Sequence, residues 1–82
     1  MLHFVYILQS LRDGKYYIGE TTNVEERLLF HNRGKQCSTK NRIPFRLIFV
    51  EKHPHRLSAL KREKQIKGWK GGEAFKKLIS EQ

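Results

Sequence analysis

Residues 3–21 read HFVYILQSLRDGKYYIGET and decide the fold, because they hold two runs rich in β-branched and aromatic residues. The first run is His3 to Gln9 and the second is Lys15 to Gly19. Asp13-Gly14 stands between them, and such a pair favours a tight turn. We therefore expect a β-hairpin.

The spacing of the two runs predicts which side chains share a face of this hairpin. A two-residue turn at Asp13-Gly14 would pair residues as follows: Tyr6 with Thr21, Leu8 with Gly19 and Ser10 with Tyr17. Because side chains alternate along a strand, Tyr6, Tyr17 and Gly19 then lie on one face. A longer loop of the same parity keeps that result, whereas a change of one residue would reverse one strand.

A helix is expected from Val24 to Arg33. Thr22 or Asn23 can cap its first turn, where the acids Glu25 and Glu26 lie near the positive end of the dipole. Gly34 is a natural residue to follow the last turn.

Arg27 and His31 are one helical turn apart and point in a common direction. At about 100° per residue, Val24, Leu28 and His31 lie within an arc of roughly 60°, and Arg27 borders this arc. The pair could cradle a phosphate and handle a proton, or it could form an ordinary solvated helix edge.

The remaining chain predicts one more strand and two more helices. Residues 34–43 carry turn formers and basic residues, so this loop is a candidate for contact with backbone phosphates. Pro44 precedes a strand over 45–51, and helical patterns follow over 56–69 and 73–80. The order β-β-α-β-α-α predicts an α/β fold of the α+β type, in which helices flank a three-stranded, mainly antiparallel sheet. The length predicts one domain over residues 1–82.

Glu63 is the carboxylate whose position is unusual. It falls on the apolar side of the helix predicted over 56–69, between Leu60 and Ile66 and close to the direction of Ala59. An inward carboxylate is costly unless it binds a cation or a donor, so Glu63 is either a metal ligand or half of a partly buried ion pair. The three tyrosines, Tyr6, Tyr16 and Tyr17, are by themselves typical of a sheet core.

The charge balance favours polyanions as partners. Seventeen Lys and Arg against eight Asp and Glu give a net charge of +9. Nucleic acid is the polyanion we expect, although proteins of the ribosome and of membrane surfaces share this balance.

Cysteine and histidine usage narrows the chemistry further. The single cysteine, Cys37, excludes an intramolecular disulfide and a Cys-based zinc site, and it fits a reducing compartment. His3, His53 and His55 lack the spacing of a metal cluster, so we expect them at the surface. With neither a signal-peptide pattern nor a long apolar stretch, the sequence predicts a cytoplasmic protein.

Several of these features together resemble the GIY-YIG nuclease superfamily. The similarity rests on Phe4-Val5-Tyr6, ten intervening residues, Tyr17-Ile18-Gly19, and then on Arg27, His31 and Glu63. The segments 17–21, 31–34 and 62–69 are similar to the small stand-alone bacterial members. Phe4 replaces the first-motif glycine, and Cys37-Ser38 departs from the Lys-Tyr common in these small proteins.

The resemblance implies an endonuclease whose catalytic residues are Tyr6, Tyr17, Arg27, His31 and Glu63. Glu63 would hold one divalent cation, Mg²⁺ or Mn²⁺, and nucleic acid would be the substrate, DNA rather than RNA. Arg27 would pair with a phosphoryl oxygen, Tyr6 would act as the base, and His31 would relay a proton. The alternatives are a basic nucleic-acid-binding module of the same fold without turnover and a protein-interaction subunit. A monomer is the default assembly.

Overall fold

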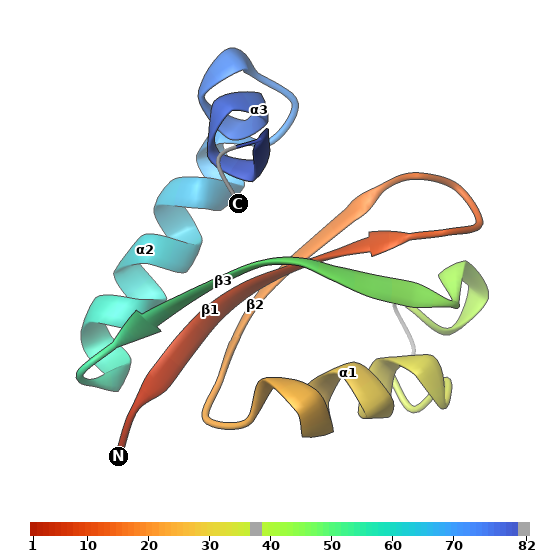
Figure 1. Cartoon of the computed structure of the whole chain (residues 1–82), viewed down its shortest axis with the longest axis horizontal. Coiled ribbons are helices and arrows are strands. Elements are labelled where there is room, and N and C mark those ends of the chain that lie inside the picture. Colours follow the sequence, from red (N-terminus) through yellow and green to blue (C-terminus); the bar gives the residue numbers. More distant parts are fainter. Residues whose placement is uncertain (37–38, 81–82) are drawn as a thin grey trace.

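The central strand β1 (His3–Ser10) organises the sheet. In this computed structural model, which describes residues 1–36 and 39–80, β1 pairs antiparallel with β2 (Tyr16–Thr21) on one side and with β3 (Phe45–His53) on the other. The strand order is β2-β1-β3. Figure 1 shows α1 (Val24–Asn32) on one face of the sheet, and α2 (Arg56–Trp69) with α3 (Glu73–Ser80) on the other. The expected α+β fold and its β-β-α-β-α-α order are therefore confirmed.

The sheet separates two small cores, because successive residues of β1 point to opposite faces. Val5 and Ile7 pack toward α2 and α3, where Ile66 and Phe75 complete the larger core. Tyr6 and Leu8 point toward α1 and pack with Phe45. This alternation places the tyrosine of the first motif beneath α1 and not in the main core.

The hairpin register differs from the expected one by two residues, although the faces do not change. Tyr6 pairs with Gly19, and Leu8 pairs with Tyr17. The turn is longer because the hydroxyl of Ser10 accepts hydrogen bonds from the backbone amides of Arg12 and Asp13, which builds a wider loop. The difference is an even number of residues, so Tyr6, Tyr17 and Gly19 still share one face.

The helix ends follow the residues expected to set them. Asn23 caps α1 by accepting a hydrogen bond from the amide of Glu26 at 3.0 Å, and Gly34 follows the helix with φ of 73°. In α2 the buried line runs through Ala59 and Ile66, whereas Leu57 and Leu60 are 61% and 39% exposed. The apolar pattern of α2 is therefore only partly buried.

The loop between α1 and β3 folds back on the hairpin. It contains a short 3₁₀ turn, η1 (Lys40–Arg42), and the carbonyl of Arg42 accepts the hydrogen bond of the Ser10 hydroxyl. Cys37 and Ser38 lie outside the described residues, so the expectations about them have no structural counterpart. Within 1–36 and 39–80, each helix is too short or too polar to span a lipid bilayer.

Candidate active site

Tyr6 is held in place by a glycine on the neighbouring strand. Its side chain is 2% exposed, and it lies across from Gly19 of β2. A Cβ atom added to residue 19 would lie 2.5 Å from the Tyr6 hydroxyl oxygen and 2.7 Å from Cζ. Only glycine leaves room for the tyrosine in this position, which is a physical reason for the glycine of the second motif.

The two motif tyrosines form one aromatic group with His31. The ring of Tyr17 lies with its centroid 4.6 Å from that of His31, and the Tyr6 and Tyr17 centroids are 6.3 Å apart. His31 comes from the last turn of α1 and is buried, with 1% exposure. The hairpin register and the phase of α1 thus bring together three residues that the sequence selected.

A hydrogen-bond chain indicates which nitrogen of His31 carries the proton. The Thr39 hydroxyl donates to the carbonyl of Gln36, so it accepts from Nδ1 of His31 at 2.9 Å. The other nitrogen, Nε2, is then the acceptor, and it lies 3.4 Å from the Tyr6 hydroxyl oxygen. His31 is therefore arranged to receive the phenolic proton. Thr39 itself is fully buried and was not predicted, because nothing in its sequence context distinguishes it from other loop threonines.

The electrostatic environment favours the neutral forms of Tyr6 and His31. Burial raises the pKa of Tyr6 well above its ordinary value, and the neighbouring charges of Tyr17, Glu63 and Glu20 raise it further, whereas Arg27 lowers it. Burial, followed by the charge of Arg27, lowers the pKa of His31. Tyr6 is consequently a proton donor in the free protein, and acting as a base would require additional positive charge near its hydroxyl.

Arg27 lies at the boundary between this group and solvent. The residue is half-buried, its Cζ atom lies 5.2 Å from the ring centroid of Phe30, and its charge acts on both Tyr6 and His31. It also lines a groove of about 790 Å³ along α1, which includes Arg33 and Lys35. Tyr6, Tyr17 and Glu63 do not line this groove.

Glu63 lies on α2, which follows the edge strand β2. Arg56 of α2 lies 3.9 Å from the carboxylate of Glu20, and Lys70 donates to the carbonyl of Tyr16 at 2.7 Å, so α2 runs along β2. Glu63 is midway between these two anchors, level with the middle of β2. That position agrees with the effect of its charge on the pKa of Tyr6.

The carboxylate of Glu63 is engaged by a neighbour on its own helix. It is 18% exposed and pairs with the ammonium of Lys67 at 2.7 Å. A partly buried ion pair was one of the two interpretations that the sequence allowed for Glu63. Among the described residues, no hydrogen bond or ion pair joins Glu63 to the aromatic group of Tyr6, Tyr17 and His31, although its charge acts on Tyr6. Among residues 1–36 and 39–80, His, Cys, Asp and Glu form no cluster of three that could hold a metal ion.

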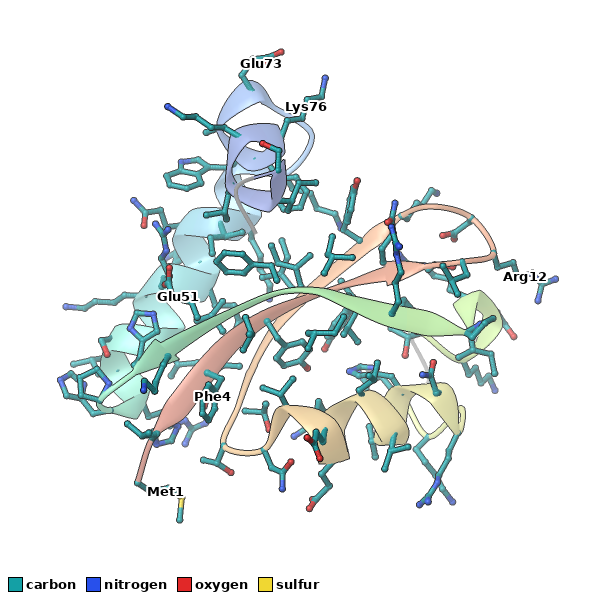
Figure 2. All side chains as sticks on the ribbon, in the orientation of Figure 1. Met1, Phe4, Arg12, Glu51, Glu73 and Lys76 are labelled. Atoms are coloured by element: carbon teal, nitrogen blue, oxygen red, sulfur yellow. The ribbon has the colours of Figure 1, made fainter. Side chains whose placement is uncertain are left out.

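Two of the histidines expected at the surface are partly buried instead. His3 contacts Glu20 and His53 contacts Glu51, each at 2.7 Å, and both histidine side chains are 17% exposed. Figure 2 shows Glu51 between β3 and α2, where it also accepts a hydrogen bond from Arg62. Each ring contacts a carboxylate of the sheet, and this contact accounts for its partial burial. His55 is exposed, and it caps α2 by accepting from the amide of Ser58.

The fold and the paired motifs define the class of protein. Residues 2–77 match the family model of the GIY-YIG catalytic domain, and the chain belongs to this family. Its relatives include UPF0213 proteins of Staphylococcus haemolyticus, 42% identical over 66 residues and 79% of each chain, and of Staphylococcus saprophyticus, 38% identical over 96% of this chain and 95% of the relative. The UPF0213 protein of Bacillus halodurans, solved by NMR in solution, aligns with a TM-score of 0.61 at 36% identity, over 98% of this chain and 84% of that one.

Proposed function

We propose that this protein is a metal-dependent endonuclease that hydrolyses phosphodiester bonds of nucleic acid, DNA in preference to RNA. The observation that carries the proposal is the contact of the Tyr6 hydroxyl with Nε2 of His31, in an aromatic group that also includes Tyr17. A buried phenol aimed at the free nitrogen of a neutral imidazole is an arrangement for moving a proton. Membership of the GIY-YIG family, whose domain is described as catalytic, supports the same assignment.

The metal requirement rests on Glu63. One carboxylate fits a hydrated Mg²⁺ or Mn²⁺ ion that is shared with substrate oxygens, and it does not fit a metal site built from protein ligands alone. Its 18% exposure leaves the carboxylate open to solvent, and Lys67 would have to give up its ion pair. When bound, the ion would neutralise charge on the phosphoryl group and stabilise the leaving oxygen.

The protein side chains would supply orientation and proton transfer. Arg27 is at the solvent boundary, where its guanidinium can donate two parallel hydrogen bonds to a non-bridging phosphoryl oxygen pair. Tyr6 would orient and deprotonate the attacking water, passing its own proton to Nε2 of His31, while Nδ1 remains bonded to Thr39. Tyr17, which is only half-buried, would line the approach of the water.

The net charge of +9 supports nucleic acid as the partner, through release of counterions. The proposed setting is the cytoplasm, with the protein acting as a monomer. We assign no sequence preference to the substrate, because phosphate contacts carry no direct sequence information.

The proposal is tested by incubating the protein with labelled DNA and RNA, with Mg²⁺, with Mn²⁺ and with EDTA. We expect cleavage that needs the cation and that is abolished in Glu63→Gln, with DNA binding at low salt retained. Glu73→Gln is the matched control, because Glu73 is an exposed acid at the start of α3, where Figure 2 shows it pointing to solvent. Loss of binding together with cleavage in Glu63→Gln would identify Glu63 as a structural ion pair.

A non-catalytic nucleic-acid-binding module is the second candidate. It is favoured by the Glu63–Lys67 ion pair, which gives the carboxylate a structural partner without a metal. Salt-dependent binding without cleavage under every cation condition would establish this function and exclude the nuclease.

A further inference from the structure

The carbonyl of Tyr16, at the start of the edge strand β2, accepts from two cationic side chains. Lys70 at the end of α2 donates through Nζ at 2.7 Å, and Arg42 of η1 donates through its guanidinium at 3.4 Å. Arg42 and Lys70 are 26 and 54 positions from Tyr16 in the sequence, so the fold brings these three residues together. A carbonyl oxygen has two lone pairs, so one backbone atom can hold both cations in place.

Two further cations complete this group, which we call the Tyr16 cation cluster and which consists of Lys15, Arg42, Lys67 and Lys70. Lys67 and Lys70 project from the same side of α2 as Glu63, within an arc of roughly 60°. Lys15 precedes Tyr16 in the chain. Burial lowers the pKa of Lys70, and the positive charges of Arg42, Lys67 and Lys15 lower it further.

Carboxylates neutralise this cluster only in part. Asp13 pairs with Arg42 at 3.2 Å, and Glu63 pairs with Lys67 at 2.7 Å. Lys70 is held by a backbone carbonyl, which carries no net charge. Like charges held together repel one another, and an incoming polyanion relieves that repulsion.

We propose that the Tyr16 cation cluster binds a backbone phosphate of nucleic acid beside the phosphate that is placed for cleavage. Its location supports this role, because Lys67 pairs with Glu63, the proposed metal ligand. Arg27 and its groove lie on the α1 side of β2, whereas Lys67 and Lys70 come from α2, which covers the other face of the sheet (Figure 1). A nucleic-acid strand that crosses the edge of β2 would therefore meet cations on both sides of the site. The choice of nucleic acid as the ligand rests on the proposed function.

The test compares the salt dependence of binding in two double variants. Lys15→Gln with Lys70→Gln removes two cluster charges and leaves Glu63 and Lys67 intact. Lys76→Gln with Lys77→Gln removes two exposed cations of α3, where Figure 2 shows Lys76 pointing to solvent. Binding of a labelled oligonucleotide duplex is measured over a series of salt concentrations in EDTA, so that no cleavage occurs, and thermal unfolding verifies that each variant is folded.

For the cluster variant we expect the slope of log affinity against log salt to become shallower by about 1, since the cluster is assigned one phosphate and each lost phosphate contact in duplex DNA changes the slope by about 0.9. The control variant should keep the wild-type slope. Equal changes in both variants would mean diffuse attraction and would overturn the proposal, as would an unchanged slope in the cluster variant. Should Lys15→Gln with Lys70→Gln unfold, Lys15→Gln alone, at an exposed position, must still reduce the slope.

Two further arms separate this inference from the proposed function. Vesicles that contain phosphatidylserine replace the oligonucleotide in one arm, and cluster-dependent binding to them without binding to DNA would overturn the proposal. In the other arm, cleavage is measured with Mg²⁺. A protein that binds through the cluster but never cleaves would refute the nuclease and keep the phosphate site. A protein that cleaves, and whose cluster variant has an unchanged salt slope, would keep the nuclease and refute the phosphate site.

Discussion

The hydroxyl of Tyr6 lies 3.4 Å from Nε2 of His31, although the two residues are 25 positions apart in the chain. Tyr6 belongs to the central strand and His31 to the last turn of α1, so the contact depends on how α1 packs against the sheet. The orientation of the imidazole depends in turn on Thr39, which lies beyond the helix.

Thr39→Val should impair the site through His31. Valine cannot accept the Nδ1 hydrogen bond, and an unsatisfied buried donor costs about 1 to 3 kcal/mol. We expect a loss of unfolding free energy of that size, measured by urea denaturation, and a lower cleavage rate with a shifted pH profile. Thr39→Ser, which keeps the hydroxyl, should restore the pH profile of the wild type. A pH profile that is identical in all three proteins would mean that Thr39 has no influence on the chemistry.

Gly19→Ala should displace Tyr6. The added methyl group would lie 2.5 Å from the Tyr6 hydroxyl oxygen, and forcing such a contact into a packed region typically costs about 1 to 3 kcal/mol. Cleavage should fall more than the remaining folded fraction explains, because the hydroxyl must move away from His31.

Gly68→Ala is the control for that substitution. A Cβ atom at residue 68 meets nothing within 4 Å, and alanine in a helix is favoured over glycine by about 0.8 to 1 kcal/mol. Gly68→Ala should therefore be neutral or stabilising, with unchanged cleavage. Equal activity losses in the two alanine variants would show that the contact with Tyr6 is not the cause.

The sequence predicted the elements well because local signals were strong. Asn23 and Gly34 mark the two ends of α1, and the β-branched and aromatic runs form the strands. It predicted the shared face of Tyr6 and Tyr17 despite a wrong register, since faces depend only on parity. The longer turn was missed because the Ser10 hydroxyl organises it, and hydrogen bonds of this kind leave little trace in a hydrophobic pattern.

The candidate site was harder to predict from sequence. The direction shared by Arg27 and His31 followed from helical geometry, but their unequal burial did not, because it depends on packing against Tyr17 and Phe45. The helical pattern predicted that the Glu63 side chain points inward, but it did not distinguish a metal ion from a cationic side chain as its partner. Lys67, one turn along the same helix, supplies that partner in the structure. The catalytic roles of all five residues stay predictions.

His31 should make the stability of the fold depend on pH. Its folded pKa is lowered by burial and by Arg27, so the unfolded chain binds more protons as the pH falls below about 6.5. Stability from this residue is complete above that pH and is lost as the pH falls toward the lower folded pKa. Urea denaturation at pH 7.5 and at pH 5.5 should therefore show a larger loss for the wild type than for His31→Gln. An equal loss in both proteins would assign the pH dependence to other groups.

Mn²⁺ should reveal by NMR whether Glu63 and Tyr6 belong to one site. The charge of Glu63 influences Tyr6, and α2 runs along β2, so a paramagnetic ion held by the Glu63 carboxylate would lie near the tyrosine rings. With isotope-labelled tyrosine, we expect Mn²⁺ to broaden the ring signals of Tyr6 and Tyr17. Glu63→Gln should abolish this broadening, whereas Glu73→Gln should leave it unchanged. Lys67→Met should strengthen it at a given Mn²⁺ concentration, because the competing ammonium is removed. Broadening that is the same in wild type and Glu63→Gln would place the cation elsewhere and separate Glu63 from the aromatic group.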